Sequence, residues 1–201
     1  MAKYATAQGL MVCGVMGYDG HLQAMPASAE RDAMVPQGSA VLVKAANLMK
    51  SCGVTAPIVS TAGTGTFSLS ADYPGVTEIQ AGSYLLMDNA YLGRGAQFQC
   101  SLTVLATVIS TRGAEHAVLD CGVKAMSGER GLPMLKDVPG ARITALHAEH
   151  ALVELDPQAS PELRPGDKLQ LWVHDSDGTV NLHTAMHGMR HGQREEVFRI
   201  G

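Results

Sequence analysis

Glycine, serine and threonine gather in loops that follow three short apolar runs in the first half of the chain. The loop Ala62-Gly-Thr-Gly-Thr66 offers backbone N–H groups at Gly63 and a hydroxyl at Thr64. Glycine lets a backbone approach a ligand closely, and N–H groups at the start of a helix bind phosphate. A phosphate-binding loop is one interpretation, and an ordinary glycine-rich turn is the other. The three runs are Leu10–Met16, Pro57–Ser60 and Val76–Gln80.

Groups that could transfer protons or bind metal stand elsewhere in the chain. Tyr18 and His21 follow the first run, where a phenol and an imidazole could move a proton, or could simply satisfy local hydrogen bonds. Three histidines recur every four residues, a spacing that would align them on one helix face. Glycines at 188 and 192 would interrupt that helix, which argues against an independent zinc site. The histidines are His183, His187 and His191.

These loops belong to βα units in the first half of the chain. Helix formers at helical spacing predict a helix from about Ala27 to Ser51, with Gly53 ending it. The apolar runs read as parallel strands, and parallel strands place functional loops at their carboxyl ends. Three such strands leave two unpaired edges, whereas an α/β barrel needs eight strands. We therefore expect the first half to be the end of a larger domain.

The second half of the chain changes to period-two alternation and predicts an all-β domain. Turn signals at Arg112-Gly113, Pro139-Gly140 and Pro165-Gly-Asp167 separate its apolar segments. The fold class is thus α/β followed by all-β. The predicted strands are Leu102–Ile109, Ala117–Leu119, Arg142–Leu146, Ala151–Leu155 and Lys168–Val173.

Composition excludes several classes of function. The 201 residues carry 15 Lys and Arg against 19 Asp and Glu, without a basic run, so we expect no nucleic-acid partner. No apolar run reaches the length that spans a bilayer and no signal peptide is evident, so we expect no membrane partner and a cytoplasmic location. The four cysteines form no CxxC pair and are expected to be buried thiols.

Several motifs, taken together, resemble the C-terminal part of the D-threonine aldolase and D-serine dehydratase family of pyridoxal-phosphate (PLP) enzymes. They occur in family order along nearly the whole chain. The motifs are Gly14-Val-Met-Gly-Tyr-Asp-Gly-His21, Val59-Ser-Thr-Ala-Gly-Thr-Gly-Thr66, Val76-Thr-Glu-Ile-Gln-Ala-Gly-Ser-Tyr84 with Asp88, Leu119-Asp-Cys-Gly-Val-Lys-Ala125, Gly166-Asp167 and Asp175-Ser-Asp-Gly-Thr-Val-Asn-Leu182.

The resemblance implies a fold like that of alanine racemase, with an α/β (TIM-like) barrel that holds PLP, followed by a β domain. Residues 1–96 would supply the last three βα units of the barrel, and residues 97–201 the β domain. The family's Schiff-base lysine lies near the start of the barrel, in a region that this sequence does not contain. No lysine here, including Lys124 in its family-like motif, stands in the family's Schiff-base lysine motif.

The same resemblance assigns roles to loop residues. Gly63 and Thr64 would contact the PLP phosphate, and Gly82 with Ser83 would form a second phosphate clamp. Gln80 would lie near the pyridine nitrogen, where a neutral side chain leaves that nitrogen largely unprotonated. Tyr18 and His21 would face the cofactor or transfer protons.

A divalent metal is also implied. Family members carry a His-x-Asp or His-x-Cys pair, and ungapped alignment through Thr179–Leu182 puts these positions on Asp175 and Asp177. On a strand, residues two apart share a face, which suits paired ligation. Two carboxylates favour Mg²⁺ or Mn²⁺, and Zn²⁺ is the softer alternative. Asp-Ser-Asp-Gly is also ordinary turn chemistry, and His174 could serve if the register shifts by one.

The function expected from the resemblance is a PLP- and metal-dependent lyase that cleaves 3-hydroxy D-amino acids by a retro-aldol reaction. Two alternatives remain open: a D-serine or 3-hydroxyaspartate dehydratase, and a non-catalytic fragment or pseudo-enzyme that lacks the Schiff-base lysine. The partners would be a small-molecule D-amino acid substrate and a second copy of the full-length chain in a homodimer. The sequence is expected to be part of a polypeptide about twice as long, and inactive by itself.

Overall fold

The computed structural model describes residues 1–92, 94 and 97–201 and divides the chain into two compact units. The first unit comprises Met1–Leu85 and Tyr91–Phe98, and the second comprises Leu86–Ala90 and Gln99–Gly201. The predicted boundary between residues 96 and 97 remains a prediction, because residue 96 lies outside the described residues. None of the helices in the described ranges combines the length and apolar character needed to cross a membrane.

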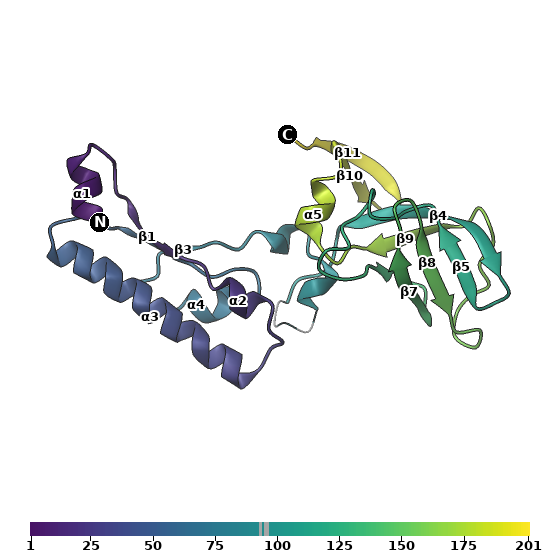
Figure 1. Ribbon diagram of the computed structural model, residues 1–201, viewed down its shortest axis with the longest axis horizontal. Helices are drawn as coiled ribbons and strands as arrows, with labels where there is room; N and C mark the ends of the chain where they lie inside the picture. The colour runs from purple at the N-terminus through teal and green to yellow at the C-terminus, as the bar shows by residue number, and fades with distance from the viewer. Residues whose placement is uncertain (93, 95–96) are drawn as a thin grey trace. The chain divides into compact units, whose positions relative to one another are not determined.

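The first unit is built on a parallel sheet of order β1-β2-β3, and the long helix α3 packs on β1 and β2 (Figure 1). Strand and helix alternate along the chain, as the βα pattern predicts. The elements are α1 (Ala2–Ala7), β1 (Gly14–Gly17), α2 (Gly20–Gln23), α3 (Ala29–Ser51), β2 (Ile58–Thr61), α4 (Phe67–Ser70), β3 (Glu78–Ile79) and the 3-10 helix η1 (Ser83–Leu85). A second 3-10 helix, η2 (Asn89–Tyr91), has residues in both units.

Both ends of α3 have the local signals that begin and end a helix. The Ser28 hydroxyl caps the first turn by accepting from the Arg31 N–H at 3.1 Å, and acidic side chains in that turn favour the positive end of the helix dipole. Gly53 follows the last turn with φ of +79°, a conformation that glycine adopts without strain. The predicted helix is therefore confirmed, including its stop.

The second unit contains a six-stranded antiparallel sheet of order β6-β9-β4-β5-β8-β7. Its edge strands, β6 and β7, also contact each other, so the sheet nearly closes on itself. This confirms the β-rich prediction for the second half of the chain. The elements are β4 (Thr103–Arg112), β5 (His116–Leu119), β6 (Met134–Leu135), β7 (Ala141–Leu146), β8 (Ala151–Leu155), β9 (Lys168–Trp172), α5 (Ser176–Val180), β10 (Ala185–Arg190) and β11 (Gln193–Arg199).

The interior of this sheet holds a continuous apolar core. Alternate residues of β5 and β8 point inward, which gives the period-two pattern seen in the sequence. The most fully buried members of the core are Val108, Leu119, Met126, Ala151, Val153, Leu171 and Val173. The sheet therefore provides a rigid support for the loops that precede and follow it.

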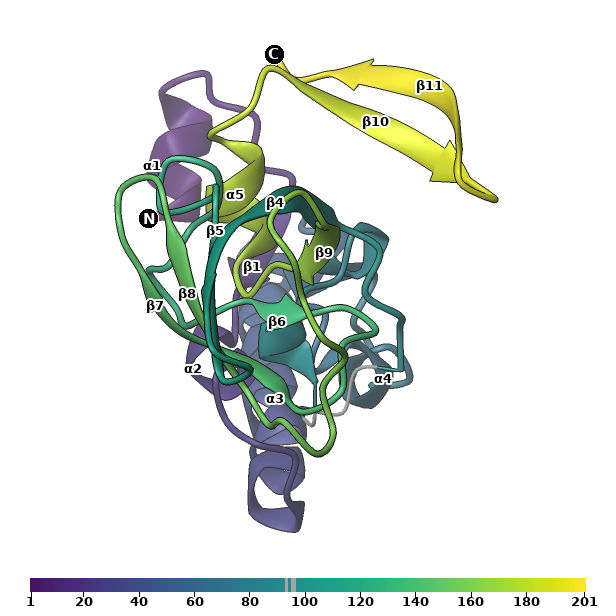
Figure 2. The ribbon, with the colours of Figure 1, turned by 90° about the vertical axis from the view of Figure 1, so that its right-hand side faces the viewer.

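Several local predictions were wrong. The loop expected at 17–21 contains the start of α2, and the first strand begins at Gly14 instead of Leu10. The elements that were not predicted include helices α1, α4 and α5, strand β6 and the hairpin β10–β11, which extends away from the main sheet of its unit (Figure 2). Cys13 and Cys52 are exposed, whereas Cys121 is buried and desolvation raises the pKa of its thiol to about 11.

Candidate functional site

The three strands of the first unit end side by side. Gly17 at the end of β1 pairs with Thr61 at the end of β2, and Thr61 pairs with Ile79 at the end of β3. The loops that follow therefore leave the sheet side by side, at the carboxyl ends of the three strands, as the parallel-strand interpretation predicts. These loops carry the sequence-predicted residues Tyr18, His21, Gly63, Thr64, Gln80, Gly82 and Ser83.

A buried glutamine organises the glycine loop after β2. The Gln23 Oε1 accepts from the Gly65 N–H at 2.8 Å, and its Nε2 donates to the Thr66 hydroxyl at 2.8 Å. That hydroxyl also accepts from the Gly63 N–H at 3.2 Å. The Gly63 amide, which was assigned to phosphate binding, and the neighbouring Gly65 amide are thus engaged inside the protein. A phosphate at this loop would be held by other donors or would replace these bonds.

The position of Gln23 also explains why the loop has glycine at positions 63 and 65. A Cβ at Gly63 would lie 2.8 Å from the Gln23 Cδ and 2.9 Å from the Tyr18 Cε2, and a Cβ at Gly65 would lie 3.0 Å from the Gln23 Oε1. Ala62, just before the loop, is fully buried with φ of 64°, a strained conformation for a residue with a side chain. Sequence reasoning missed Gln23, because a single glutamine in a short helix carries no recognisable pattern.

The second and third loops are joined directly. The Tyr84 N–H donates to the buried Thr64 hydroxyl at 3.1 Å, which brings Ser83, at the start of η1, beside the glycine loop. A Cβ at Gly82 would meet nothing within 4 Å, so the surroundings of that residue are open. Gln80 is exposed, and its N–H donates to the Thr61 carbonyl at 2.9 Å.

The two proposed proton-transfer groups occupy different surroundings. The Tyr18 ring lies against the backbone of Gly63 and Gly20, and half of the residue stays exposed. His21 is exposed within α2. The structure therefore brings Tyr18 onto the glycine loop, whereas His21 faces solvent.

The acidic pair lies in the second unit, and its local structure corrects the geometric argument made for it. Asp175 and Asp177 do not lie on a strand: Asp175 is the N-cap of α5, where its carboxylate accepts from the Gly178 N–H at 3.4 Å, and Asp177 is in the first turn. Asp175 is buried, and the Asp177 side chain is 67% exposed. The ligand assignment remains a prediction that no longer rests on strand alternation.

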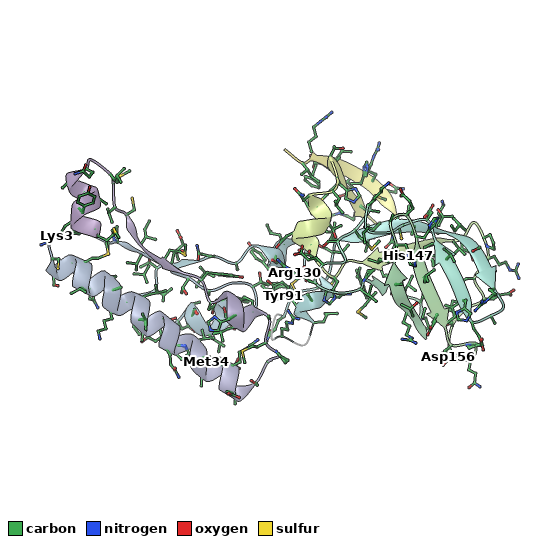
Figure 3. All side chains as sticks on the ribbon, in the orientation of Figure 1. Lys3, Met34, Tyr91, Arg130, His147 and Asp156 are labelled. Atoms are coloured by element: carbon green, nitrogen blue, oxygen red, sulfur yellow. The ribbon has the colours of Figure 1, made fainter. Side chains whose placement is uncertain are left out.

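The buried Asp175 is surrounded by donors. The Ser127 hydroxyl donates to its Oδ2 at 2.7 Å, and the Ser127 N–H donates to the Thr179 hydroxyl at 3.1 Å, so this segment and α5 are linked twice. The Arg130 Nη1 lies 3.7 Å from the Asp175 Oδ1 and 3.8 Å from the Asp177 Oδ2. Figure 3 labels Arg130 near α5.

A second buried carboxylate supports the start of α5. Asp88 Oδ2 accepts from the Ser176 N–H at 2.9 Å, while its Oδ1 and both polar atoms of the Asn89 side chain are buried without a hydrogen-bond partner among the described residues. Burial, together with the nearby Asp88 carboxylate, raises the pKa of the Cys100 thiol. Asp88 and Asn89 thus place polar atoms with unused hydrogen-bonding capacity close to the acidic pair.

Other singled-out residues lie apart. Lys124 forms a surface ion pair with Glu149 at 2.5 Å, and exposed pairs of this kind contribute little to stability. His183 contacts the Ala125 carbonyl, while His187 lies on β10 and His191 in the hairpin turn, so the three imidazoles share no helix face. Across the described ranges, no three His, Cys, Asp or Glu side chains form a metal cluster.

Comparison with known proteins gives a consistent relationship. Residues 101–189 match the family described as "Putative serine dehydratase domain". D-threonine aldolase of an Arthrobacter species is 33% identical over 200 residues, which is 96% of this chain and 52% of that protein. Along nearly its whole length the chain is therefore similar to the C-terminal part of the D-threonine aldolase and D-serine dehydratase-like family. It spans about half the length of the curated relatives that it matches.

Solved structures of this aldolase and dehydratase family share the fold. The D-threonine aldolase of Filomicrobium marinum is 30% identical, with a TM-score of 0.86 over 98% of this chain and 55% of that one. The D-threo-3-hydroxyaspartate dehydratase of Delftia sp. HT23 has a TM-score of 0.89 over 99% of this chain and 59% of that one. At 23% identity, the second likeness shows the fold alone.

Proposed function

We propose that this chain is the C-terminal part of a PLP- and metal-dependent lyase that cleaves 3-hydroxy D-amino acids by a retro-aldol reaction. The observation that carries the proposal is the Thr64–Tyr84 hydrogen bond, which joins two of the three loops at one end of the parallel sheet. Sites for phosphorylated cofactors form in loops at the carboxyl ends of parallel strands. The 33% identity to an Arthrobacter D-threonine aldolase supports the aldolase over the dehydratase alternative.

The missing parts of the site would come from preceding polypeptide. We propose that β1, β2 and β3 are the last three strands of a TIM-like barrel, with residues 1–96 in the barrel and 97–201 in the β domain. Among the described residues β1 and β3 are the edge strands of the three-stranded sheet, and Met11 and Met16 at and before β1 are exposed. Both features support this, because further strands would cover them. The Schiff-base lysine would lie in those added strands.

The first unit has a donor set that fits the PLP phosphate. The open surroundings of Gly82, the Ser83 hydroxyl and the neighbouring Thr64 would hold that group, while Gln23 keeps the glycine loop in shape. Gln80 would face the pyridine nitrogen. Tyr18, half exposed over Gly63, could hold a proton at its phenol oxygen, with His21 as a second candidate. When bound, PLP supplies an electron sink for the bond that breaks beside the amino-bearing carbon.

The acidic pair fits a divalent cation through its oxygen donors and its charge. One cationic nitrogen already lies within 4 Å of a carboxylate oxygen from each of Asp175 and Asp177, so the two groups can share a positive charge. Carboxylate oxygens favour Mg²⁺ or Mn²⁺ over Zn²⁺. Two protein ligands leave positions for substrate or water. A cation there would supply Lewis-acid polarisation of the substrate's 3-hydroxyl.

Product analysis tests this proposal and separates its alternatives. The protein at its native length, supplied with PLP and Mn²⁺, would be incubated with D-threonine. Retro-aldol cleavage gives glycine and acetaldehyde in equal amounts, whereas dehydration gives 2-oxobutanoate and ammonia. We expect the first pair. The second pair would favour the dehydratase. With D-threo-3-hydroxyaspartate the corresponding products are glycine and glyoxylate, or oxaloacetate and ammonia, and no product from either substrate would favour a non-catalytic protein.

The remaining proposals concern assembly and location. We propose a homodimer of the full-length protein, a D-amino acid as the small-molecule ligand, and a cytoplasmic location. The formal charge of −4 supports the absence of a nucleic-acid partner. Analytical ultracentrifugation of the native protein would test the dimer, because a monomer at catalytic concentrations would contradict it.

A further inference from the structure

The guanidinium of Arg130 lies close to both carboxylates of the acidic pair in the second unit. Its Nη1 atom lies 3.7 Å from an oxygen of Asp175 and 3.8 Å from an oxygen of Asp177. The two carboxylates belong to the same short helix start, and one positively charged nitrogen bridges them. Among the described residues, Arg130 is therefore the positively charged side chain that lies within 4 Å of both carboxylates.

The three partners differ in how firmly they are held. Asp175 is 2% exposed and also accepts hydrogen bonds from Ser127 and Gly178, so its carboxylate is fixed. A buried carboxylate is costly unless an opposite charge compensates it. The Arg130 side chain is 58% exposed, so it can leave the pair for solvent. A fixed anion thus faces a cation that is free to move away.

We propose that Arg130 and a divalent cation compete for the Asp175–Asp177 pair, so that Arg130 sets the metal affinity of the site. This inference rests on the proposed function, which assigns the pair to metal binding. Two positive charges within 4 Å of the same oxygens repel each other, so a bound ion displaces the guanidinium. Without the ion, Arg130 compensates the buried Asp175. The buried Asp175 carboxylate therefore has an opposite charge beside it in both states.

The experiment measures Mn²⁺ binding to the protein at its native length, by electron paramagnetic resonance of the free ion. R130Q removes the competing charge and should lower the dissociation constant about two- to fivefold, which corresponds to the free energy of a partly exposed charge pair. R130K keeps the charge and should stay close to wild type. R164Q, which removes an exposed arginine paired with Glu162, is the matched control and should change nothing.

The outcomes separate this inference from the proposed function. Equal affinities of wild type and R130Q, with binding lost in D177N, would overturn the role of Arg130 and leave the metal site standing. Absence of Mn²⁺ binding in every variant would overturn both. The gain in R130Q should also shrink as salt is added, because salt screens the removed charge, and a salt-independent gain would contradict competition. Near-ultraviolet circular dichroism of Trp172 would check that each variant is folded.

Discussion

The two units of the chain are stabilised in different ways. The second buries a continuous apolar cluster inside a nearly closed sheet, with side chains such as Leu119 and Leu171 fully shielded. The first leaves Leu10, Met11 and Met16 exposed, and buries polar groups such as Gln23. The comparison teaches that the β unit carries its own continuous core, whereas the βα unit exposes apolar surface that further polypeptide would cover.

The largest expected effect comes from the core of the second unit. Leu171→Ala should lower the free energy of unfolding by about 2–5 kcal/mol, because it opens a cavity in a packed sheet interior. Urea titration followed by Trp172 fluorescence would measure it. Leu105→Ala is the matched control, since Leu105 is 65% exposed on β4. Equal losses in the two variants would contradict a self-contained core.

The corresponding test in the first unit concerns Gln23. Gln23→Ala leaves the Gly65 N–H without its partner and removes one of the two hydrogen bonds to the Thr66 hydroxyl, which should cost about 1–3 kcal/mol. It should also weaken PLP retention, because the glycine loop loses its support. Gln37→Ala, at an exposed position of α3, provides the control for both thermal unfolding and PLP titration. Unchanged thermal unfolding and PLP binding in Gln23→Ala would show that polar contacts do not organise this unit.

Some elements of the fold could be predicted from the sequence more closely than others. The helix α3 and the strand Ala151–Leu155 have signals within a few residues, a capping serine and strict alternation, and both were predicted closely. The positive φ angles of Gly113, Gly140 and Gly166 likewise match predicted turns. In these cases the local chemistry and the final fold agree.

Features that depend on distant contacts were missed. The hairpin strand Gln193–Arg199 is exposed throughout, so burial imposes no alternation on its sequence. The helix α5 forms around the capping Asp175 and contains a glycine, which hides its periodicity. Gln23 and Arg130 act on residues more than 40 positions away along the chain, and a single sequence carries no record of those distances.

A smaller effect on stability is expected at Ser127, whose hydroxyl supports the acidic pair in the second unit. Ser127→Ala removes the hydroxyl that donates to Asp175 and should cost about 0.5–1.5 kcal/mol in unfolding free energy. Ser110→Ala, at an exposed position on β4, is the control. If the two serine variants lose the same stability, the hydroxyl contact with Asp175 contributes nothing specific to the β unit.

The smallest effect concerns pH. The Thr107 N–H donates to the Asp120 carboxylate at 2.6 Å, and this bond lowers the pKa of Asp120 below its ordinary value of 3.8. The contact therefore stabilises the fold above the ordinary pKa and is lost as the pH falls through the lower, folded value. Asp120→Ala should flatten this acidic part of the stability profile. A profile identical to wild type in acid would contradict the assignment.

The measurement that tests the central claim most directly is the intact mass of the polypeptide in its native source. The proposed lyase requires a lysine-bearing barrel in addition to the 21.1 kDa described by this sequence. Because the chain spans 52% of its D-threonine aldolase relative, we predict a mass about twice that value. A native mass of 21.1 kDa would contradict the account, since the Schiff-base lysine would then have to come from another polypeptide.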